Sequence, residues 1–561
     1  MKDTLPHIAL RPPEQVMRLS RLGSSHQTRL SFMRILLRRL SADRWSFERQ
    51  TFEIDDNGVG RAVYLAKGPE RTYALVAFAH DLPDELRSDR VIAEAWDATF
   101  TLFDGIPTDT DLERLERNVP LQEAGRVSER ELTLSRANRS ARLWEHVVSS
   151  LANGNQPEKQ VLEAVGYLMR TTAVYGSGKF GAADREVIAA RAETRAPFQA
   201  EMLTVYLIRW FVRELVEHLA KARGGSNAVQ LADDAAKALG IGNSTGLGMA
   251  PFLINHPVLF NNWIVAREEA LRRVRSLETV EQEDFSLFRD RLERVGVLLQ
   301  SWRSEHPLQQ AKFAQLKDDY RAICVHLETF DFRQALSWNR LVQWSQQALS
   351  EEGQELLNAL VLEPYGALVD DLSKSMSDDE AGARVLDGAM RVGEVLMLLE
   401  SSFGWTSTLD WEQRPNCARA WYVSEEKLEP RLGERFEEPL AEFEQPLSPA
   451  RDAAAAIEAL KGWAVDTPVA DFLLACPEHR QSVERAQLTR VAPYGEIRDN
   501  TIAADVMPID MLRAKLSFFG ATRFDPRSDR WVRITMFAGA PYPNALDDDF
   551  ADDWVFPEHV A

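Results

Sequence analysis

The sequence predicts a mainly α protein with a smaller antiparallel β portion, that is, an α+β fold. Apolar and polar residues alternate over 45–105 and again over 514–539, which is typical of strands with one buried face. Between these stretches, residues 136–402 repeat their apolar residues at the spacing of amphipathic helices. We therefore expect a large helical domain plus a sheet built from the N-terminal meander and the C-terminal hairpin, because an isolated hairpin is only marginally stable in water.

The composition divides the chain into five segments. Residues 1–44 form an N-terminal extension with a basic helix, and 45–135 form an antiparallel β meander with loops. Residues 136–402 form the helical domain, and 403–450 form a charged, proline-punctuated irregular connection. Residues 451–561 carry C-terminal helices and a β hairpin that joins the N-terminal sheet.

The expected elements follow from these patterns. Strands are predicted at 45–54, 60–68, 71–80 and 89–105, with turn residues between them. Helices are predicted near 137–152, 157–173, 183–194, 197–222, 227–239, 258–276, 280–303, 307–328, 332–349, 352–373, 378–402, 450–463 and 481–490.

Overall composition excludes several classes of protein. The 561 residues are 45% hydrophobic and 27% charged, which is globular composition and not that of a disordered chain. The net charge of −20 argues against nucleic acid as a partner, because a phosphate backbone requires a cationic face. Cys324, Cys417 and Cys476 are too widely spaced for a disulfide framework, which favours a cytoplasmic location.

The sequence predicts no membrane partner. Its most apolar long stretch, 198–222, is interrupted by Arg209, Arg213 and Glu214, as in a buried amphipathic helix. The basic helix at 25–45 has the composition of a transit peptide or a membrane-surface helix. Because its apolar residues share one face, we expect it to dock on the body of the protein.

A glycine-rich stretch in the helical segment suggests an anion-binding loop. Gly176, Gly178 and Gly181 match the spelling G-x-G-x-x-G, but the helix at 197–222 follows where a dinucleotide fold needs a second strand. The loop can still present backbone N–H groups and a helix N-terminus to an anion. The candidate substrate-binding residues here are Arg170, Thr171, Thr172, Gly176, Ser177, Gly178, Lys179 and Arg185. The alternative is that the glycines only end one helix and Asp184 caps the next.

A second glycine-rich loop has similar chemistry. Residues 240–257 contain the polar run Asn243, Ser244 and Thr245, followed by His256. Glycine lets the backbone approach a ligand closely, although an ordinary interhelical turn has the same composition. Two further clusters are polar. The first lies in 489–508, where Arg498 is a candidate clamp for a carboxylate. The other cluster, at a predicted helix start, consists of Ser135, Arg136, Asn138, Arg139 and Ser140.

No metal site is predicted, and any cofactor is left open. The ten histidines show no H-x-x-x-H, H-x-H or H-x-x-E-H spacing. His80 with Asp81, Glu85 and Asp89 is a weak oxygen-rich candidate, and whether it binds a metal is left open.

The leading functional hypothesis is a metal-independent cytoplasmic enzyme that acts on a small anionic metabolite, either a carboxylate or a phosphorylated compound. The reaction type (lyase, isomerase or transferase) is unresolved. Arg170, Lys179 and Arg185 would hold the anion, and His256 or Tyr175 would be the catalytic proton-transfer group. The alternative is a non-catalytic binding or scaffold protein with structural glycine loops. A homo-oligomer is left open.

Overall fold

The computed structural model describes most of the chain as two compact units. Unit 1 comprises residues 1–25, 245–286 and 304–515, and unit 2 comprises 26–244, 287–303 and 516–561. The residues described are all except 1–7, 19, 22–25, 84–94, 122–126, 173–187, 189, 245–256, 305–306, 377–385, 412–420, 424–427, 431–444, 448, 496–514, 522, 526–532, 547–551 and 558–561.

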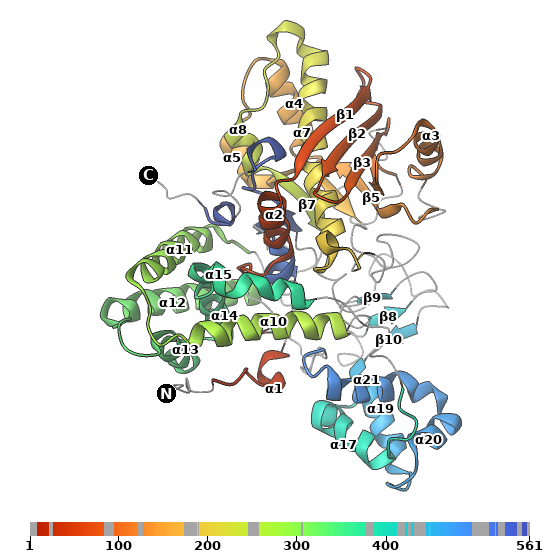
Figure 1. Ribbon diagram of the computed structural model, residues 1–561, viewed down its shortest axis with the longest axis vertical. Helices are drawn as coiled ribbons and strands as arrows, with labels where there is room; N and C mark the ends of the chain where they lie inside the picture. Colours follow the sequence, from red (N-terminus) through yellow and green to blue (C-terminus); the bar gives the residue numbers. More distant parts are fainter. Residues whose placement is uncertain are drawn as a thin grey trace. The chain divides into compact units, whose positions relative to one another are not determined.

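Unit 2 is built on a mixed sheet in the order β1-β2-β3-β4-β5-β6-β7-β12-β11 (Figure 1). The strands are β1 (Ser46–Ile54), β2 (Gly60–Lys67), β3 (Thr72–Ala79), β4 (Ala98–Asp104), β5 (Glu131–Arg139), β6 (Tyr167–Thr172), β7 (Gly240–Ser244), β11 (Arg523–Asp525) and β12 (Arg533–Met536). Strands β1 to β5 pair antiparallel in sequence order, as the meander prediction requires. The C-terminal hairpin joins the same sheet, since β12 pairs with β7.

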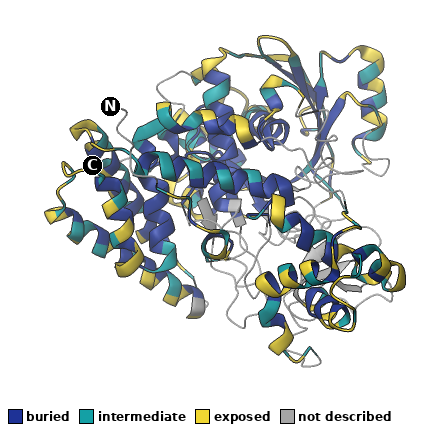
Figure 2. Cartoon of the chain, turned by 60° about the horizontal axis from the view of Figure 1, so that its bottom comes forward, coloured by how far each residue is buried: buried dark blue, intermediate teal, exposed yellow. Residues whose placement is uncertain are grey.

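Helices cover both faces of this sheet. Those of unit 2 are α2 (Phe32–Ala42), α3 (Asp109–Asn118), α4 (Trp144–Ala152), α5 (Lys159–Val165), α7 (Gln199–Gly224) and α8 (Asp233–Ala238). On one face, Leu112 and Leu115 of α3 pack on the apolar residues of β2 to β5. On the other face, Phe211 of α7 contacts Phe100 and Tyr64 edge-on. Most residues of β2, β3 and β4 are therefore buried (Figure 2).

Three strands lie where the sequence predicted a helix, the start of a helix or a loop. The predicted helix 157–173 ends as α5 at Val165, and β6 follows it. The predicted helix start near 137 is the end of β5, and α4 begins only at Trp144. Strand β7 replaces a predicted loop. Because β6 and β7 are parallel, the β portion is mixed and not wholly antiparallel.

The basic helix α2 docks on unit 2, as expected. It buries Phe32, Leu36 and Leu40 along one side, and fully burying such a side chain contributes about 1.5–3 kcal/mol. Its Phe32 ring stacks on Phe198, which precedes α7. The arginines that suggested a membrane surface instead bind a carboxylate of the same unit.

That carboxylate belongs to Asp552 near the C-terminus. Its oxygens accept bonds from Arg29 at 2.8 Å and from Arg38 at 2.7 Å, and Arg34 Nε lies 3.4 Å away. Burial of Asp552 opposes its ionisation, but the three guanidiniums outweigh burial and hold the pKa of its carboxyl well below its usual range. The C-terminal segment is thus fastened to the first helix of the unit.

We predict that Asp552→Asn lowers the free energy of unfolding by about 1.5–3 kcal/mol at pH 7, the usual value of hydrogen bonds to charged groups. Because the folded-state pKa is depressed, this stabilisation is present at neutral pH and is lost as the pH falls below about 4. Urea denaturation at pH 7 and pH 4 measures both effects. Asp553→Asn is the control, since the Asp553 side chain is 48% exposed and its loss should be smaller. Equal losses for the two variants would contradict the assignment.

Unit 1 is mainly helical. Its helices are α1 (Pro13–Val16), α10 (Pro257–Arg275), α12 (Pro307–Thr329), α13 (Ser337–Ala348), α14 (Glu351–Leu360), α15 (Gly366–Val369), α17 (Val392–Phe403), α19 (Pro449–Lys461), α20 (Val469–Ala475) and α21 (Arg480–Val491). Helix α11 (Gln282–Ser301) begins in unit 1 and ends in unit 2. The segment predicted as irregular contains three short strands, β8 (Trp421–Val423), β9 (Leu428–Pro430) and β10 (Gln445–Leu447).

Arg11 joins two helices of unit 1 through buried charges. Its guanidinium donates to Glu268 of α10 at 2.8 Å and to Glu355 of α14 at 2.5 Å. All three side chains are at most 4% exposed. Burial of Glu355 opposes its ionisation, yet Arg11 lowers the pKa of this carboxyl to about 2. Each carboxylate therefore depends on the same arginine.

We predict that Arg11→Met destabilises unit 1 by about 3–5 kcal/mol. The substitution removes the guanidinium that bridges two buried carboxylates and leaves Glu268 only Arg267 at 3.2 Å and Glu355 only Arg21 at 3.4 Å as arginine partners among the described residues. Arg18→Met, in the same segment, is the matched control: Arg18 pairs with Glu351 but is 49% exposed, so its loss should be at most about 1 kcal/mol. Thermal denaturation of the three proteins measures the difference. Similar melting temperatures for Arg11→Met and the wild type would rule out the bridging role.

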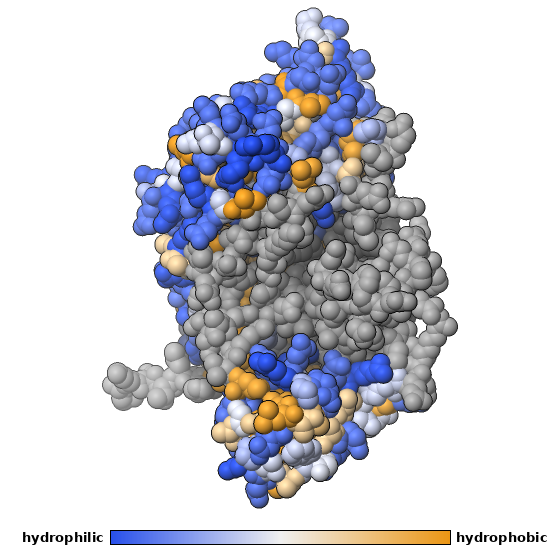
Figure 3. Space-filling model, turned by 90° about the vertical axis from the view of Figure 1, so that its right-hand side faces the viewer, coloured by the Kyte–Doolittle hydropathy of each residue, from blue (hydrophilic) through white to orange (hydrophobic). Residues whose placement is uncertain are grey.

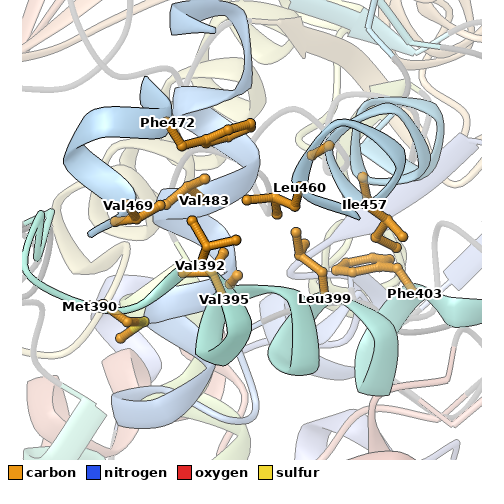
Figure 4. Close-up of a cluster of buried hydrophobic side chains, with 13 residues drawn as sticks. Met390, Val392, Val395, Leu399, Phe403, Ile457, Leu460, Val469, Phe472 and Val483 are labelled. Atoms are coloured by element: carbon orange, nitrogen blue, oxygen red, sulfur yellow. The ribbon is translucent and has the colours of Figure 1, made fainter. Parts of the chain in front are cut away.

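Helices α17, α19, α20 and α21 form a small bundle in unit 1. Figure 4 shows Val395 and Leu399 of α17 facing Leu460 of α19, with Phe472 of α20 beside them, and all of these side chains are buried. Hydrophobic side chains also reach the surface of this bundle (Figure 3). The exposed large hydrophobic residues among its described positions are Met397, Val465, Leu474 and Val491.

Candidate functional site

Both glycine-rich segments begin at adjacent parallel strands of unit 2. Strand β6 ends at Thr172 and β7 ends at Ser244, with Arg170 opposite Gly242 and Thr171 opposite Asn243. The carboxyl ends of parallel strands lie at the same edge, and open sheets with parallel strands bind ligands there. The described bases of the two predicted loops are therefore neighbours, although they lie about 70 positions apart in the sequence.

The structure brings together five of the predicted site residues. Arg170, Thr171 and Asn243 have described side chains, which are 5%, 0% and 1% exposed, and Thr172 and Ser244 end their strands. The other predicted residues lie outside the described part of the chain. They are Tyr175, Gly176, Ser177, Gly178, Lys179, Arg185, Thr245, His256 and Arg498.

Glycine in β7 is required by the closeness of its neighbours. A Cβ on Gly240 would lie 2.2 Å from the backbone oxygen of Met536 in β12. A Cβ on Gly242 would lie 2.7 Å from the Tyr167 ring of β6. Gly240 is thus the first residue of a strand and does not cap the preceding helix. Part of the glycine pattern that suggested a ligand loop serves strand packing instead.

Arg209 of α7 holds β7 and β12 in place. This arginine is 2% exposed and donates to the carbonyl oxygens of Leu239 and Ala540, each at 2.8 Å. Leu239 precedes β7, and Ala540 follows β12. Burial lowers the pKa of Arg209, which also donates to the carbonyl oxygen of Ala236 at 3.3 Å and lies 4.1 Å from the centroid of the Tyr542 ring. An arginine inside this apolar helix therefore anchors the amino-terminal end of β7 and the adjoining end of β12.

We predict that Gly240→Ala weakens the pairing of β7 with β12 and costs about 2 kcal/mol or more, because a backbone oxygen cannot move aside as a flexible side chain can. Hydrogen exchange of the β12 amides measures the local opening directly. Gly404→Ala is the control, because a Cβ there meets nothing within 4 Å. Unchanged protection of β12 in Gly240→Ala would show that the two strands are not tightly packed.

Two arginines lie on one face of the sheet beside this edge. Asn138 of β5 is directly opposite Arg170 of β6, and Arg136 is opposite Thr172. Residues opposite each other share a face, as do residues two apart along one strand. Arg136 and Arg170 are therefore diagonal neighbours on the same face, with Cα atoms about 7–8 Å apart. Strand β12 adds Arg533 opposite Ser244 in the ladder.

Arg136 is oriented by an aromatic ring. Its guanidinium lies 4.0 Å from the centroid of the Trp96 ring, and stacking of this kind fixes the plane of the guanidinium. Thr99 of β4 is directly opposite Arg136 on this face, and the Oγ1 atom of Thr99 lies 2.9 Å from Nε2 of His80. We call His80, Trp96, Thr99, Arg136, Asn138 and Arg170 the sheet-face cluster.

Buried polar contacts position the segment that carries Trp96. The Asn138 side chain accepts a bond from the Asp97 N–H at 2.9 Å and donates to the carbonyl oxygen of Ala95 at 3.2 Å. The Asp97 carboxylate, which is 0% exposed, accepts the Arg139 N–H at 2.9 Å. Trp96 is therefore held between two residues whose backbone is tied to β5.

The electrostatics of the cluster favour an anion. Burial lowers the pKa of Arg136, which nevertheless stays charged at neutral pH. Burial also lowers the pKa of His80, against the opposing effect of the Asp97 carboxylate, so the imidazole is largely neutral at pH 7. Guanidinium groups can bind a carboxylate or phosphate, and a neutral imidazole on the same face can exchange a proton with a bound group.

The sequence named Arg136 and Asn138 but placed them at a helix start. The alternation of Glu131, Leu132, Thr133 and Leu134 is the signal that identifies their strand. The contact between Trp96 and Arg136 could not be predicted from the sequence, since it depends on the pairing of β4 with β5.

Only His80 and Asp81 of the candidate metal site lie in the described part of the chain. Glu85 and Asp89 lie outside the described residues, and His80 bonds Thr99. Within the described part of the chain, no group of three His, Cys, Asp or Glu side chains is placed to hold a metal ion. Among the described helices, none combines the length and the apolar character needed to cross a membrane.

Comparisons with family models, with curated proteins and with solved structures found no match to this chain.

Proposed function

We propose that this protein is a cytoplasmic enzyme that binds a small anionic metabolite, a carboxylate or a phosphorylated compound, at the carboxyl edge of β6 and β7. The observation that carries the proposal is the pair Arg136 and Arg170, which extend from neighbouring strands on one face of the sheet. Guanidinium groups bind carboxylates and phosphates through two parallel hydrogen bonds. Both glycine-rich segments begin at the same edge.

The burial of the two arginines supports a small ligand. Arg170 is 5% exposed, and Arg136 is half-buried against Trp96. Charged hydrogen bonds are stronger where water is partly excluded, so a single carboxylate or phosphate group gains more here than on an open surface. An extended polyanion such as nucleic acid would need a broad cationic surface, which the net charge of −20 disfavours.

The same geometry suits chemistry that runs on protein side chains. A lyase, an isomerase or a transferase needs an anion clamp and a group that can exchange a proton, and the sheet-face cluster holds both kinds of group. The cytoplasmic location forms part of this proposal and is supported by Cys476, a described cysteine that is free.

We predict that Arg136→Gln and Arg170→Gln each weaken anion binding about tenfold or more, because a hydrogen bond to a charged group contributes about 1.5–3 kcal/mol. The measurement is the rise in melting temperature of the full chain with citrate, phosphate, pyrophosphate and sulfate. A ligand at 100 times its Kd stabilises the folded protein by about 2.7 kcal/mol.

Arg130→Gln is the matched control for these variants. Arg130 also stacks on an aromatic ring, at 4.3 Å from the centroid of Phe103, but lies away from the edge of β6 and β7. Its anion response should equal that of the wild type. If no anion raises the melting temperature, or if all three arginine variants respond alike, the proposal fails and a non-catalytic scaffold becomes the better description.

A further inference from the structure

His80 lies beside the proposed anion site and is not yet assigned a role there. It follows β3, and its Nε2 atom bonds Thr99 Oγ1, whose residue is directly opposite Arg136. Residues opposite each other in a ladder are about 4.5–5.5 Å apart and share a face. The imidazole therefore lies on the face that carries both arginines, two strands from Arg136, with β4 between them.

We propose that anion binding to Arg136 is coupled to protonation of His80, so that the site takes up one proton from solvent as a dianion binds. The proposal rests on the proposed function and identifies the substrate class more closely. Three positive charges, those of Arg136, Arg170 and the imidazolium, match a ligand with two or more negative charges. The structure thus favours a phosphorylated compound or a polycarboxylate over a simple monocarboxylate.

The charges that face His80 explain why the coupling depends on the ligand. Arg136 lies on the same face of the sheet, on β5. The Asp97 carboxylate favours the imidazolium, and the backbone N–H of His80 donates to the carbonyl oxygen of Asp97 at 2.9 Å. Arg139 lies 3.6 Å from the Asp97 carboxylate and partly compensates its charge, while Asp81 adjoins His80 in the chain. Without a ligand, burial keeps the ring neutral.

An anion held by Arg136 reverses this balance. It adds a negative charge on the face of the sheet that carries the ring, which favours the imidazolium and raises the pKa of His80. In the protonated ring, Nε2 is a donor and Thr99 Oγ1 accepts its bond. The proton returns to solvent when the anion leaves. Such a ring holds a proton next to the bound substrate at neutral pH, which is the requirement for a general acid.

Sulfate is the probe for this coupling, because it is a dianion at every pH between 5 and 9 and its own titration cannot contribute. The experiment follows the Cε1–H signals of the histidines by NMR in the full chain from pH 5 to pH 9, with sulfate or with chloride at equal ionic strength. His80→Gln identifies the His80 signal. We expect sulfate, but not chloride, to raise the pKa of His80 by about one unit, and sulfate affinity to increase about tenfold at low pH through linkage.

Three controls make the outcomes distinct. The Cε1–H signal of His218 on α7, whose ring bonds the carbonyl oxygen of Asp55, should not distinguish sulfate from chloride. Arg136→Gln should cancel the shift of His80. If sulfate raises the melting temperature through Arg136 but leaves the pKa of His80 unchanged, the coupling is wrong and the proposed function stands. If sulfate binding does not depend on Arg136, the proposed function fails and the coupling with it. An equal shift in sulfate and in chloride would also overturn the coupling.

Discussion

The parallel pairing of β6 with β7 is the constraint on which the site depends. Parallel neighbours cannot be joined by a tight turn and need a long crossover, which here contains the 26-residue helix α7. This helix packs on the sheet, and its Arg209 binds the carbonyl oxygens at the start of β7 and after β12. The crossover therefore helps to fix β7 beside β6, and the two glycine-rich segments begin at the common edge of these strands.

The sequence predicted the helices and strands that are long enough to show a clear hydrophobic period. The meander of β1 to β4, the long helices and the C-terminal hairpin follow from periodicity and from turn residues. It failed for β6 and β7, which have only six and five residues, and β7 contains Gly240 and Gly242. Glycine has low β propensity, and a strand this short shows no reliable period. What fixes these strands is tertiary: the Tyr167 ring over Gly242 and the close backbone of Met536.

The candidate site was predictable in its chemistry but not in its geometry. Arg170, Thr171 and Asn243 were chosen because polar residues adjoin glycine, and register shows them to be neighbours. The sequence pattern places Arg136 at the start of a helix, so its closeness to Arg170 could not be predicted. His80 was considered only as a metal ligand, since nothing in the sequence connects it with Thr99 or with β5. Strand order, and not composition, brings these residues together.

Local charge in this protein differs from its overall balance. The chain carries a net charge of −20, yet arginines are buried inside both units. Arg11 bridges two glutamates, three arginines surround Asp552, and Arg136 stacks on an aromatic ring.

We propose above all that Arg136 binds an anion together with Arg170. The most direct measurement is an anomalous difference map from crystals grown with selenate, a heavy analogue of sulfate. A peak within about 3 Å of both guanidiniums is the predicted result. Selenate bound only elsewhere, in a crystal that leaves this face open to solvent, would contradict it.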